Sequence, residues 1–134
     1  MDKIYVDTNI FLDALKDRTS RNGRDLGTPA MSVLSQAKHG RFKIIVSDWT
    51  LQELGKHIET EKVEELFSDI GEEQIIRCSY SEEQKKKAKE SSDHWEDYLH
   101  GLIAEEEDVD CIVTRNVDDF RILSGVKAKL PGQI

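Results

Sequence analysis

Carboxylate side chains near the ends of short apolar runs are the residues of this sequence best suited to chemistry. Asp7 directly follows the β-prone residues 3–6, and Glu53 falls in the second turn of a helix that begins after the apolar run 42–46. Asp97 shares a helical face with Gly101 and Ala104, whose small size leaves room for an ion and a substrate. Because carboxylate oxygens suit hard cations such as Mg2+, these acids are candidate ligands of a divalent metal ion.

Each candidate acid has a structural alternative that the sequence leaves open. Asp7 could equally cap the helix that follows it. Glu53 and Thr50 match a capping box, in which the glutamate supports the first turn of its own helix. For Asp97 the alternative is an ordinary solvated helix face, and for the acidic pair 118–119 it is a turn.

Other residue types give weaker chemical signals. His94 and His100 are interpreted as surface residues, or as residues that support the site, rather than as ligands. Cys78 and Cys111 are expected to be reduced, small buried thiols. No Cys-x-x-Cys or His-x-x-x-His spacing indicates zinc, and no glycine-rich phosphate loop follows a strand, so no nucleotide cofactor is expected.

The elements that must position these side chains alternate between strands and helices. Strands are predicted at residues 3–6, 42–46, 74–78, 110–114 and 126–130. Helices are predicted from residue 10, over 29–39, from 48, over 63–70, from 81 and around 95–103, with a polar loop at 17–29. This alternation predicts an α/β fold with a parallel sheet covered by helices on both sides. Ligands of such sheets bind beyond the carboxyl ends of the strands, where Asp7 is expected.

Composition favours one soluble domain spanning residues 1–134. The chain has a formal net charge of −8, whereas nucleic-acid binders are usually basic. Residues 1–43 nevertheless hold eight Lys and Arg against five Asp, a local charge of +3. No run approaches the roughly 18 apolar residues of a membrane span, and the N-terminus lacks signal-peptide features, so a cytoplasmic location is expected.

Four segments, in order, resemble the motifs of the PIN-domain family. The run IYVDTNIFLD at residues 4–13 resembles the family's opening strand and Asp-Thr-Asn turn. The run SDWTLQEL at 47–54 is similar to the second motif, DYLH at 97–100 followed by Ala104 to the third, and VDCIVTRNVDDF at 109–120 to the fourth. Together they cover nearly the whole chain. One such motif would be weak support, but four in the same order are specific.

The resemblance implies a fold and a set of site residues. The fold would be a three-layer α/β/α arrangement around a mostly parallel sheet of four to five strands. Asp7, Glu53 and Asp97 match the family's core acids. Asn116 stands where the fourth acid usually follows Thr-Arg, which leaves Asp119, and less so Asp118, to supply that carboxylate. The resemblance makes Asp7, Asp97 and Asp119 ligands of Mg2+ or Mn2+, and makes Thr8, Asn9, Thr114 and Arg115 substrate-positioning residues.

The function implied by the resemblance is metal-dependent endoribonuclease activity. A lone domain of this size is similar to VapC-type toxins of toxin–antitoxin pairs, which implies an RNA substrate, a homodimer and a small antitoxin partner. Because of Asn116, a degenerate PIN domain that binds RNA or a protein without cleavage remains an alternative. A phosphoryl-transfer protein with Asp7 as phospho-acceptor is another, although Asp7-Thr8-Asn9 lacks the Asp-x-Asp of such phosphatases.

Overall fold

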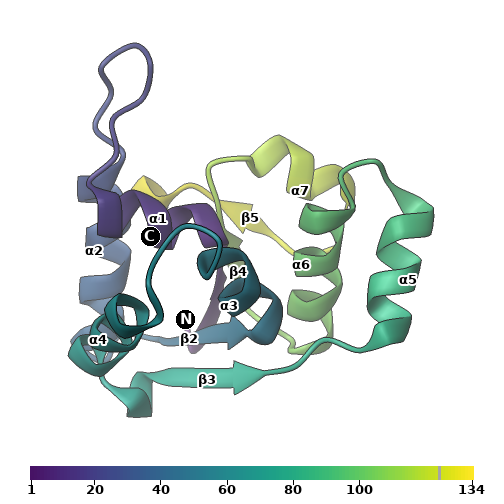
Figure 1. Ribbon diagram of the computed structural model, residues 1–134, viewed down its shortest axis with the longest axis horizontal. Helices are drawn as coiled ribbons and strands as arrows, with labels where there is room; N and C mark the ends of the chain where they lie inside the picture. Colours follow the sequence, from purple (N-terminus) through teal and green to yellow (C-terminus); the bar gives the residue numbers. More distant parts are fainter. Residues whose placement is uncertain (124) are drawn as a thin grey trace.

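A parallel sheet of five strands forms the centre of the molecule (Figure 1). The computed structural model describes residues 1–123 and 125–134, and of residues 121–123 it describes the backbone only. The strands lie in the order β3-β2-β1-β4-β5, and every neighbouring pair is parallel. Their bounds are β1 Lys3–Val6, β2 Lys43–Ser47, β3 Ile75–Cys78, β4 Cys111–Val113 and β5 Ala128–Lys129. The predicted α/β class and parallel sheet are confirmed.

Helices cover both faces of this sheet. The helices are α1 Thr8–Lys16, α2 Gly27–Lys38, α3 Asp48–Leu54, α4 Thr60–Ile70, α5 Glu82–Ser91, α6 Trp95–Glu106 and α7 Val117–Leu123, with 3-10 turns η1 Glu72–Gln74 and η2 Pro131–Gln133. In Figure 1, α1, α2 and α4 lie on one side of the sheet, and α5, α6 and α7 on the other. The three-layer α/β/α arrangement is therefore confirmed.

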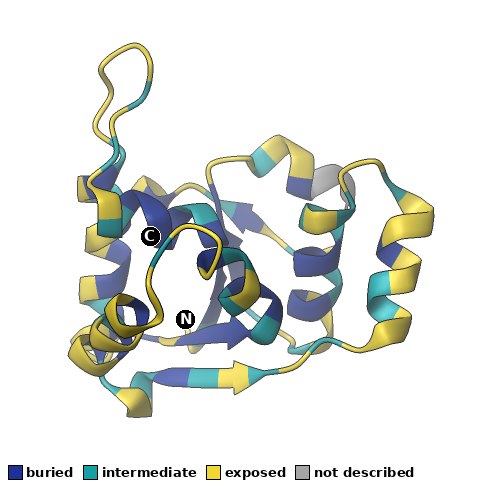
Figure 2. Ribbon diagram, viewed as in Figure 1, coloured by how far each residue is buried: buried dark blue, intermediate teal, exposed yellow. Residues whose placement is uncertain are grey.

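The alternation of side chains along β1 explains the two layers of core. Ile4 and Val6 point into a cluster with α1, α2 and α4, whereas Tyr5 points into a second cluster with α5, α6 and α7. Successive strand residues face opposite sides, so a strand covered on both faces must be apolar throughout, and residues 4–6 are fully buried. Figure 2 shows the same pattern: the inner strands are largely buried, the edge strand β3 is partly exposed, and the outer helix faces are exposed.

The strand order indicates where a ligand would bind without reference to any particular residue. Counting outward from β1, the chain proceeds through β2 and β3 on one side, and through β4 and β5 on the other. The order therefore changes direction between β1 and β4. Ligands of open α/β sheets bind at such a point, beyond the carboxyl ends of the strands. Asp7 follows β1 there and Thr114 follows β4.

Several boundaries differ from the sequence prediction. Helix α2 begins at Gly27, two residues before the predicted start, because the Asp25 carboxylate accepts a hydrogen bond from the Thr28 backbone at 3.1 Å. The predicted loop 17–29 contains an antiparallel bridge between Thr19 and Asp25. We call residues 18–25 the hairpin. The expected turn at 118–119 is part of helix α7, and the last strand is shorter than predicted.

The two cysteines are free thiols in the structure. Cys78 ends β3 and Cys111 begins β4, with β2 and β1 between them. Neighbouring strands lie about 4.8 Å apart, which puts these two strands roughly 14 Å apart, beyond the Cα–Cα span of about 7 Å that a disulfide allows. Among the described helices, none has both the length and the apolar character needed to cross a membrane.

Candidate active site

Asp7 stands at the carboxyl end of β1 and in the N-cap position of α1, but its side chain does not cap the helix. Its Oδ2 instead accepts a hydrogen bond of 3.0 Å from the hydroxyl of Thr114, at the end of β4. Asp7 is only 2% exposed, and burial raises its pKa. Burying a carboxylate without compensating partners costs folding free energy. Because the side chain makes no cap hydrogen bond in return, the helix-cap interpretation does not explain why Asp7 is buried.

Glu53 lies in the second turn of α3, and the capping-box interpretation of Thr50 and Glu53 is wrong. The N-cap of α3 is Ser47, whose Oγ accepts from the Thr50 backbone at 3.1 Å. The Glu53 Oε1 accepts from the Thr8 hydroxyl at 2.6 Å and lies 2.5 Å from Nε2 of His100. Both partners reach the same oxygen of the carboxylate, which fixes its orientation toward the end of β1.

His100 was predicted to be a surface residue or a residue that supports the site. It is 1% exposed, so the surface interpretation is wrong, while its contact with Glu53 agrees with a supporting role. Its Nδ1 lies 2.6 Å from the Tyr5 hydroxyl, which in turn lies 2.8 Å from Oγ of Ser47. Two sequence features could have indicated this contact: a tyrosine within the apolar strand β1 and a histidine three residues after Asp97.

The electrostatics of this pair are consistent with a protonated His100 and an ionised Glu53. Burial alone would lower the pKa of His100, but the hydrogen bond to Glu53 and the charge of Asp7 raise it. Burial also acts against ionised Glu53, but the hydrogen bond and charge of His100 outweigh it, so the pKa of Glu53 is lowered. In this state Nε2–H donates to Glu53 and Nδ1–H donates to the oxygen of Tyr5.

Asp97 faces the same region from α6. Burial, followed by the negative charges of Asp7, Glu53 and Asp119, raises its pKa to about 6, against the opposing charge of His100. Three acids, Asp7 after β1, Glu53 in α3 and Asp119 in α7, are thus close enough to raise the pKa of Asp97. Clustered carboxylates of this kind favour a proton or a cation among them.

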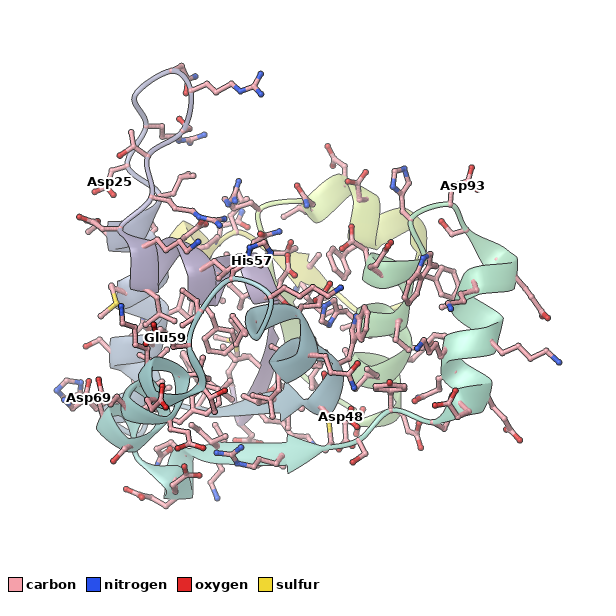
Figure 3. The ribbon with its side chains drawn as sticks, viewed as in Figure 1. Asp25, Asp48, His57, Glu59, Asp69 and Asp93 are labelled. Atoms are coloured by element: carbon pink, nitrogen blue, oxygen red, sulfur yellow. The ribbon has the colours of Figure 1, made fainter. Side chains whose placement is uncertain are left out.

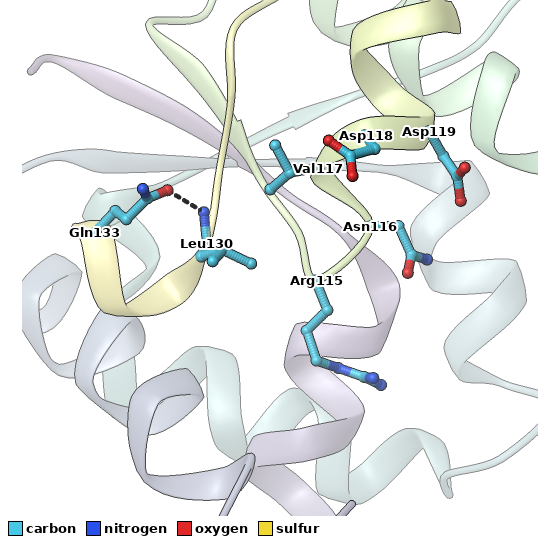
Figure 4. A pocket seen from close by; sticks show the side chains of 7 residues that line it. All are labelled: Arg115, Asn116, Val117, Asp118, Asp119, Leu130 and Gln133. Carbon is cyan, nitrogen blue, oxygen red and sulfur yellow. Dashed lines mark hydrogen bonds between the residues drawn. The ribbon is translucent and has the colours of Figure 1, made fainter. Parts of the chain in front are cut away.

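Residues 114–116 join β4 to α7, and residues 117–119 form the first turn of α7; we call the whole segment 114–119 the catalytic turn. The Thr114 hydroxyl donates to Asp7 and accepts from the Asn116 backbone at 3.0 Å. Asn116 and Asp119 extend to the same side of the turn in Figure 4, and Asp118 extends to another. The charge of Asp119, rather than that of Asp118, is among the main causes that raise the pKa of Asp97.

Arg115 is engaged in a structural contact. Its Nε donates to Oδ2 of Asp13 at 2.7 Å, and a second guanidinium nitrogen lies 3.3 Å from Oδ1. Asp13 is fully buried in α1 and also lies 3.8 Å from Arg18. No local sequence pattern predicts this pair, since its partners are 102 residues apart. The substrate-positioning roles of Arg115 and of Asn9, which is half-buried in the first turn of α1, stay predictions.

The donor set suits a hard divalent cation held by few protein ligands. Within the part of the chain that the structure describes, no three His, Cys, Asp or Glu side chains are arranged to bind one ion together. Mg2+ is commonly held by one or two carboxylates and retains several waters, so a closed cage is not required. Asp7 is buried and directed at the end of β4, and Asp97 has an elevated pKa that a cation would reverse. These residues therefore fit Mg2+ or Mn2+.

Comparisons with known proteins agree with the fold. The family described as PIN domain matches residues 3–118. No curated protein matches the sequence. Among solved structures, the crystal structure of VapBC2 from Rickettsia felis bound to a DNA fragment from their promoter is similar, with a TM-score of 0.61 and 16% identity over 96% of this chain and 98% of the matched chain. At 16% identity the structural likeness supports the fold alone. The family match supports membership of the family, because it covers most of the sequence. The chain therefore belongs to the PIN domain family.

Proposed function

We propose that the chain is a divalent-metal-dependent endoribonuclease that hydrolyses RNA phosphodiester bonds. The observation that carries the proposal is the convergence of Asp7, Glu53 and Asp119 on Asp97, whose pKa is raised to about 6 by burial first and then by the charges of these three acids. Perturbed acids gathered at one edge of a sheet are typical of catalytic sites. A phospho-acceptor role for Asp7 would not need the other three acids.

Asp7 and Asp97 would hold Mg2+ or Mn2+, with Asp119 approaching from α7. A bound divalent ion lowers the pKa of a water nucleophile and neutralises charge on the phosphoryl oxygens. The Thr114 hydroxyl, at 3.0 Å, keeps the Asp7 carboxylate in one orientation. Thr8 and His100 hold Oε1 of Glu53, so the ionised carboxylate can accept a hydrogen bond from the attacking water through its other oxygen.

The biological setting we propose is that of a toxin in a toxin–antitoxin pair. The support is the motif resemblance to VapC-type proteins, together with the likeness to a chain of the VapBC2 structure. The chain would then act in the cytoplasm as a homodimer, and a small antitoxin would inhibit it by covering the acidic pocket. Expression of the chain alone should arrest growth, and co-expression of a neighbouring small reading frame should relieve the arrest.

The nuclease proposal is tested by cleavage of a labelled single-stranded RNA with Mg2+, with Mn2+ and with EDTA. We expect cleavage that EDTA abolishes and that Asp7→Asn reduces by at least about a hundredfold, since the charge of a central ligand is lost. Asp69→Asn is the matched control, because Asp69 lies on α4 and pairs with Lys38 at 3.0 Å (Figure 3). Cleavage that survives EDTA, or that Asp7→Asn retains, would refute the proposal.

A second candidate is an RNA- or protein-binding PIN domain without cleavage, and Asn116 is the residue that favours it. Asn116 can offer a carbonyl oxygen at the catalytic turn but no negative charge. If the wild type binds RNA without cutting it, and Asn116→Asp introduces metal-dependent cleavage, this second function is correct. If the wild type cuts and Asn116→Asp only tightens metal binding, the nuclease is correct and the asparagine merely weakens one metal position.

A further inference from the structure

A hollow surface runs from the catalytic turn to the hairpin. Its first part has a volume of about 500 Å3 and is bordered by the catalytic turn, Leu130 and Gln133 (Figure 4). Its second part, of about 450 Å3, extends to the hairpin and η2. The two parts share Arg115, Asn116, Leu130 and Gln133. We call this continuous surface the trough. Asn116 and Asp119 of the candidate site line the trough, whereas Asp7, Glu53 and Asp97 do not, so the trough adjoins the site already described.

The hairpin that forms one wall of the trough is held by its own hydrogen bonds. The Ser20 backbone donates to the Arg24 carbonyl at 2.8 Å, and the Arg24 backbone donates to the Ser20 hydroxyl at 3.0 Å. At the base, the backbones of Leu26 and Gly27 both donate to the Arg18 carbonyl. The hairpin stands away from the body of the molecule and is mostly exposed (Figures 1 and 2). The sequence thus builds a defined projection beside the trough.

This projection is basic in an acidic protein. Residues 18–24 contain three arginines and no acidic residue, whereas the whole chain has a net charge of −8. Arg18 lies 3.8 Å from buried Asp13, which leaves Arg21 and Arg24 as the exposed cations. Arg24 lines the trough. Asp25 also lines it, and its carboxylate, which accepts a hydrogen bond from the Thr28 backbone at the start of α2, keeps its negative charge beside Arg24.

The two ends of the trough differ in charge. Asp118 and Asp119 lie at the catalytic end. Arg24 and Asp25 lie together at the hairpin end, where exposed Arg21 leaves an excess of positive charge. Between them the lining is largely apolar, formed by Leu26, Pro29, Leu130 and Pro131. Leu130 is 41% exposed, unusually high for a large hydrophobic residue of this structure. A phosphate would be repelled at the acidic end and attracted at the basic end, while a base could lie on the apolar floor.

Single-stranded RNA fits this combination better than a duplex. Proteins bind unpaired nucleotides by stacking bases on aromatic rings or guanidinium planes and by placing backbone phosphates beside arginines. The described lining of the trough offers the guanidinium groups of Arg24 and Arg115, with the exposed apolar surface of Leu130 in place of an aromatic ring. Asn22 and Gln133 add amide groups that can bond to base edges. A partner protein's segment would also find apolar contacts here, but it would not require the arginines of the hairpin.

We propose that the trough binds the single-stranded part of the RNA substrate that flanks the scissile bond, with Arg24 at a backbone phosphate and Leu130 under a base. The proposal rests on RNA being the substrate of the proposed nuclease. It adds that the RNA strand leaves the catalytic turn past Asn116 toward the hairpin. The fold then determines which side of the cut contributes to affinity.

Binding of a labelled single-stranded RNA is measured in EDTA by fluorescence anisotropy, with Asp7→Asn present throughout so that no cleavage occurs. Arg24→Ala should raise the Kd roughly three- to tenfold and make the dependence of log Kd on log salt shallower by about one. Leu130→Ala should raise the Kd without changing the salt dependence. Arg41→Ala is the control. It removes the same charge from the loop before β2, which lies at the amino ends of the strands, whereas the trough lies near their carboxyl ends.

The outcomes separate this inference from the proposed function. If the parent chain cuts RNA but Arg24→Ala and Leu130→Ala leave the Kd unchanged, the trough is not the RNA path and the inference fails alone. If the chain cuts no RNA, yet binds it with the expected loss in Arg24→Ala, the nuclease proposal fails and the binding site stands. An equal loss in Arg41→Ala would mean non-specific charge attraction and would also overturn the inference.

Discussion

Asp7 and Asp97 are held in positions where burial and mutual repulsion both oppose ionisation. Burial is the largest cause of the raised pKa of each acid. For Asp97, the charge of Asp7 is the second cause. An acid with a raised pKa reduces the stability of the folded state when it is ionised. For Asp97 this cost is absent below the ordinary carboxyl pKa of about 4. It grows as the pH rises to about 6 and is complete above that.

Replacing Asp97 with asparagine should therefore stabilise the metal-free protein at neutral pH. We expect Asp97→Asn to raise the free energy of unfolding by on the order of 1 kcal/mol at pH 7.5, allowing for solvent screening of a half-buried group. The gain should disappear at pH 4, where wild-type Asp97 is already neutral. Urea unfolding in EDTA at both pH values measures it. A gain of equal size at both pH values would contradict the electrostatic explanation.

His100 is a positioning residue for Glu53 on the same reasoning. It connects the buried Tyr5 hydroxyl, at 2.6 Å, to the Glu53 carboxylate, at 2.5 Å. We expect His100→Gln to lower kcat at least about tenfold with little change in KM, since a glutamine cannot serve both partners and supply the positive charge. Steady-state kinetics well below the unfolding temperature measure this effect.

Leu99→Ala is the control for His100→Gln. It removes a buried side chain from the same helix and should cost about 2–5 kcal/mol of stability, without touching Glu53. If His100 were only a core residue, both variants would retain the wild-type kcat at low temperature. A normal kcat in His100→Gln would therefore exclude the positioning role.

The acids of the candidate site were predicted from local signals together with the order of the four family motifs, since Asp97 taken alone is typical of a solvated helix face. Asp7 follows a short strand, Glu53 follows a capped helix start, and Asp97 lies on a small-residue face. The partners of these groups could not be predicted in the same way. Tyr5 and His100 are separated by 95 residues in the chain, and Asp13 and Arg115 by 102. Only the folded arrangement of β1, α6 and the catalytic turn brings them together.

At the scale of elements, α1 is fixed to the catalytic turn by the ion pair of Asp13 and Arg115. Asp13 is fully buried, and the pair has two contacts of 2.7 and 3.3 Å. Removing one partner of a buried pair leaves the other charge without compensation. The same turn carries Asn116 and Asp119, so the pair links the stability of α1 to the geometry of the site.

Asp13→Asn should lower the free energy of unfolding by about 2–4 kcal/mol, with the smaller values favoured because the Arg115 side chain is 35% exposed. Asp17→Asn, which changes an exposed aspartate at the end of the same helix, should change it by less than about 0.5 kcal/mol. Urea unfolding curves compare the two. Equal effects would show that the pair contributes nothing beyond the general charge balance.

The predicted elements were correct where hydrophobic periodicity was strong, and less so where polar side chains decide the boundary. Strands β1 to β4 appear because each is a short run that contains Ile, Val or both, whereas β5, Ala128–Lys129, has neither and is shorter than predicted. Helix α7 was missed because Asp118 and Asp119 resemble turn residues, although acids are also favourable in the first turn of a helix. The start of α2 was misplaced because Asp25 caps the helix from a position outside it.

The whole molecule combines a net charge of −8 with a basic N-terminal third. Self-repulsion of excess charge opposes the compact state, and salt reduces this repulsion. Salt should therefore stabilise the folded chain in general. The acidic site should respond to Mg2+ beyond this screening, because an ion that binds only the folded state stabilises it by mass action.

We expect the unfolding temperature to rise more in MgCl2 than in NaCl of equal ionic strength. At a Mg2+ concentration ten times the Kd, binding contributes about 1.4 kcal/mol, which corresponds to roughly 3–6 °C for a domain of this size. Asp7→Asn should remove the difference between the two salts while keeping the shared response to ionic strength. It should also begin from an equal or higher melting temperature in EDTA, because burial raises the pKa of Asp7. Differential scanning fluorimetry of both proteins measures all of these quantities without any RNA. If MgCl2 and NaCl stabilise the wild type equally, the four acids do not form a metal site, whatever the protein does to RNA.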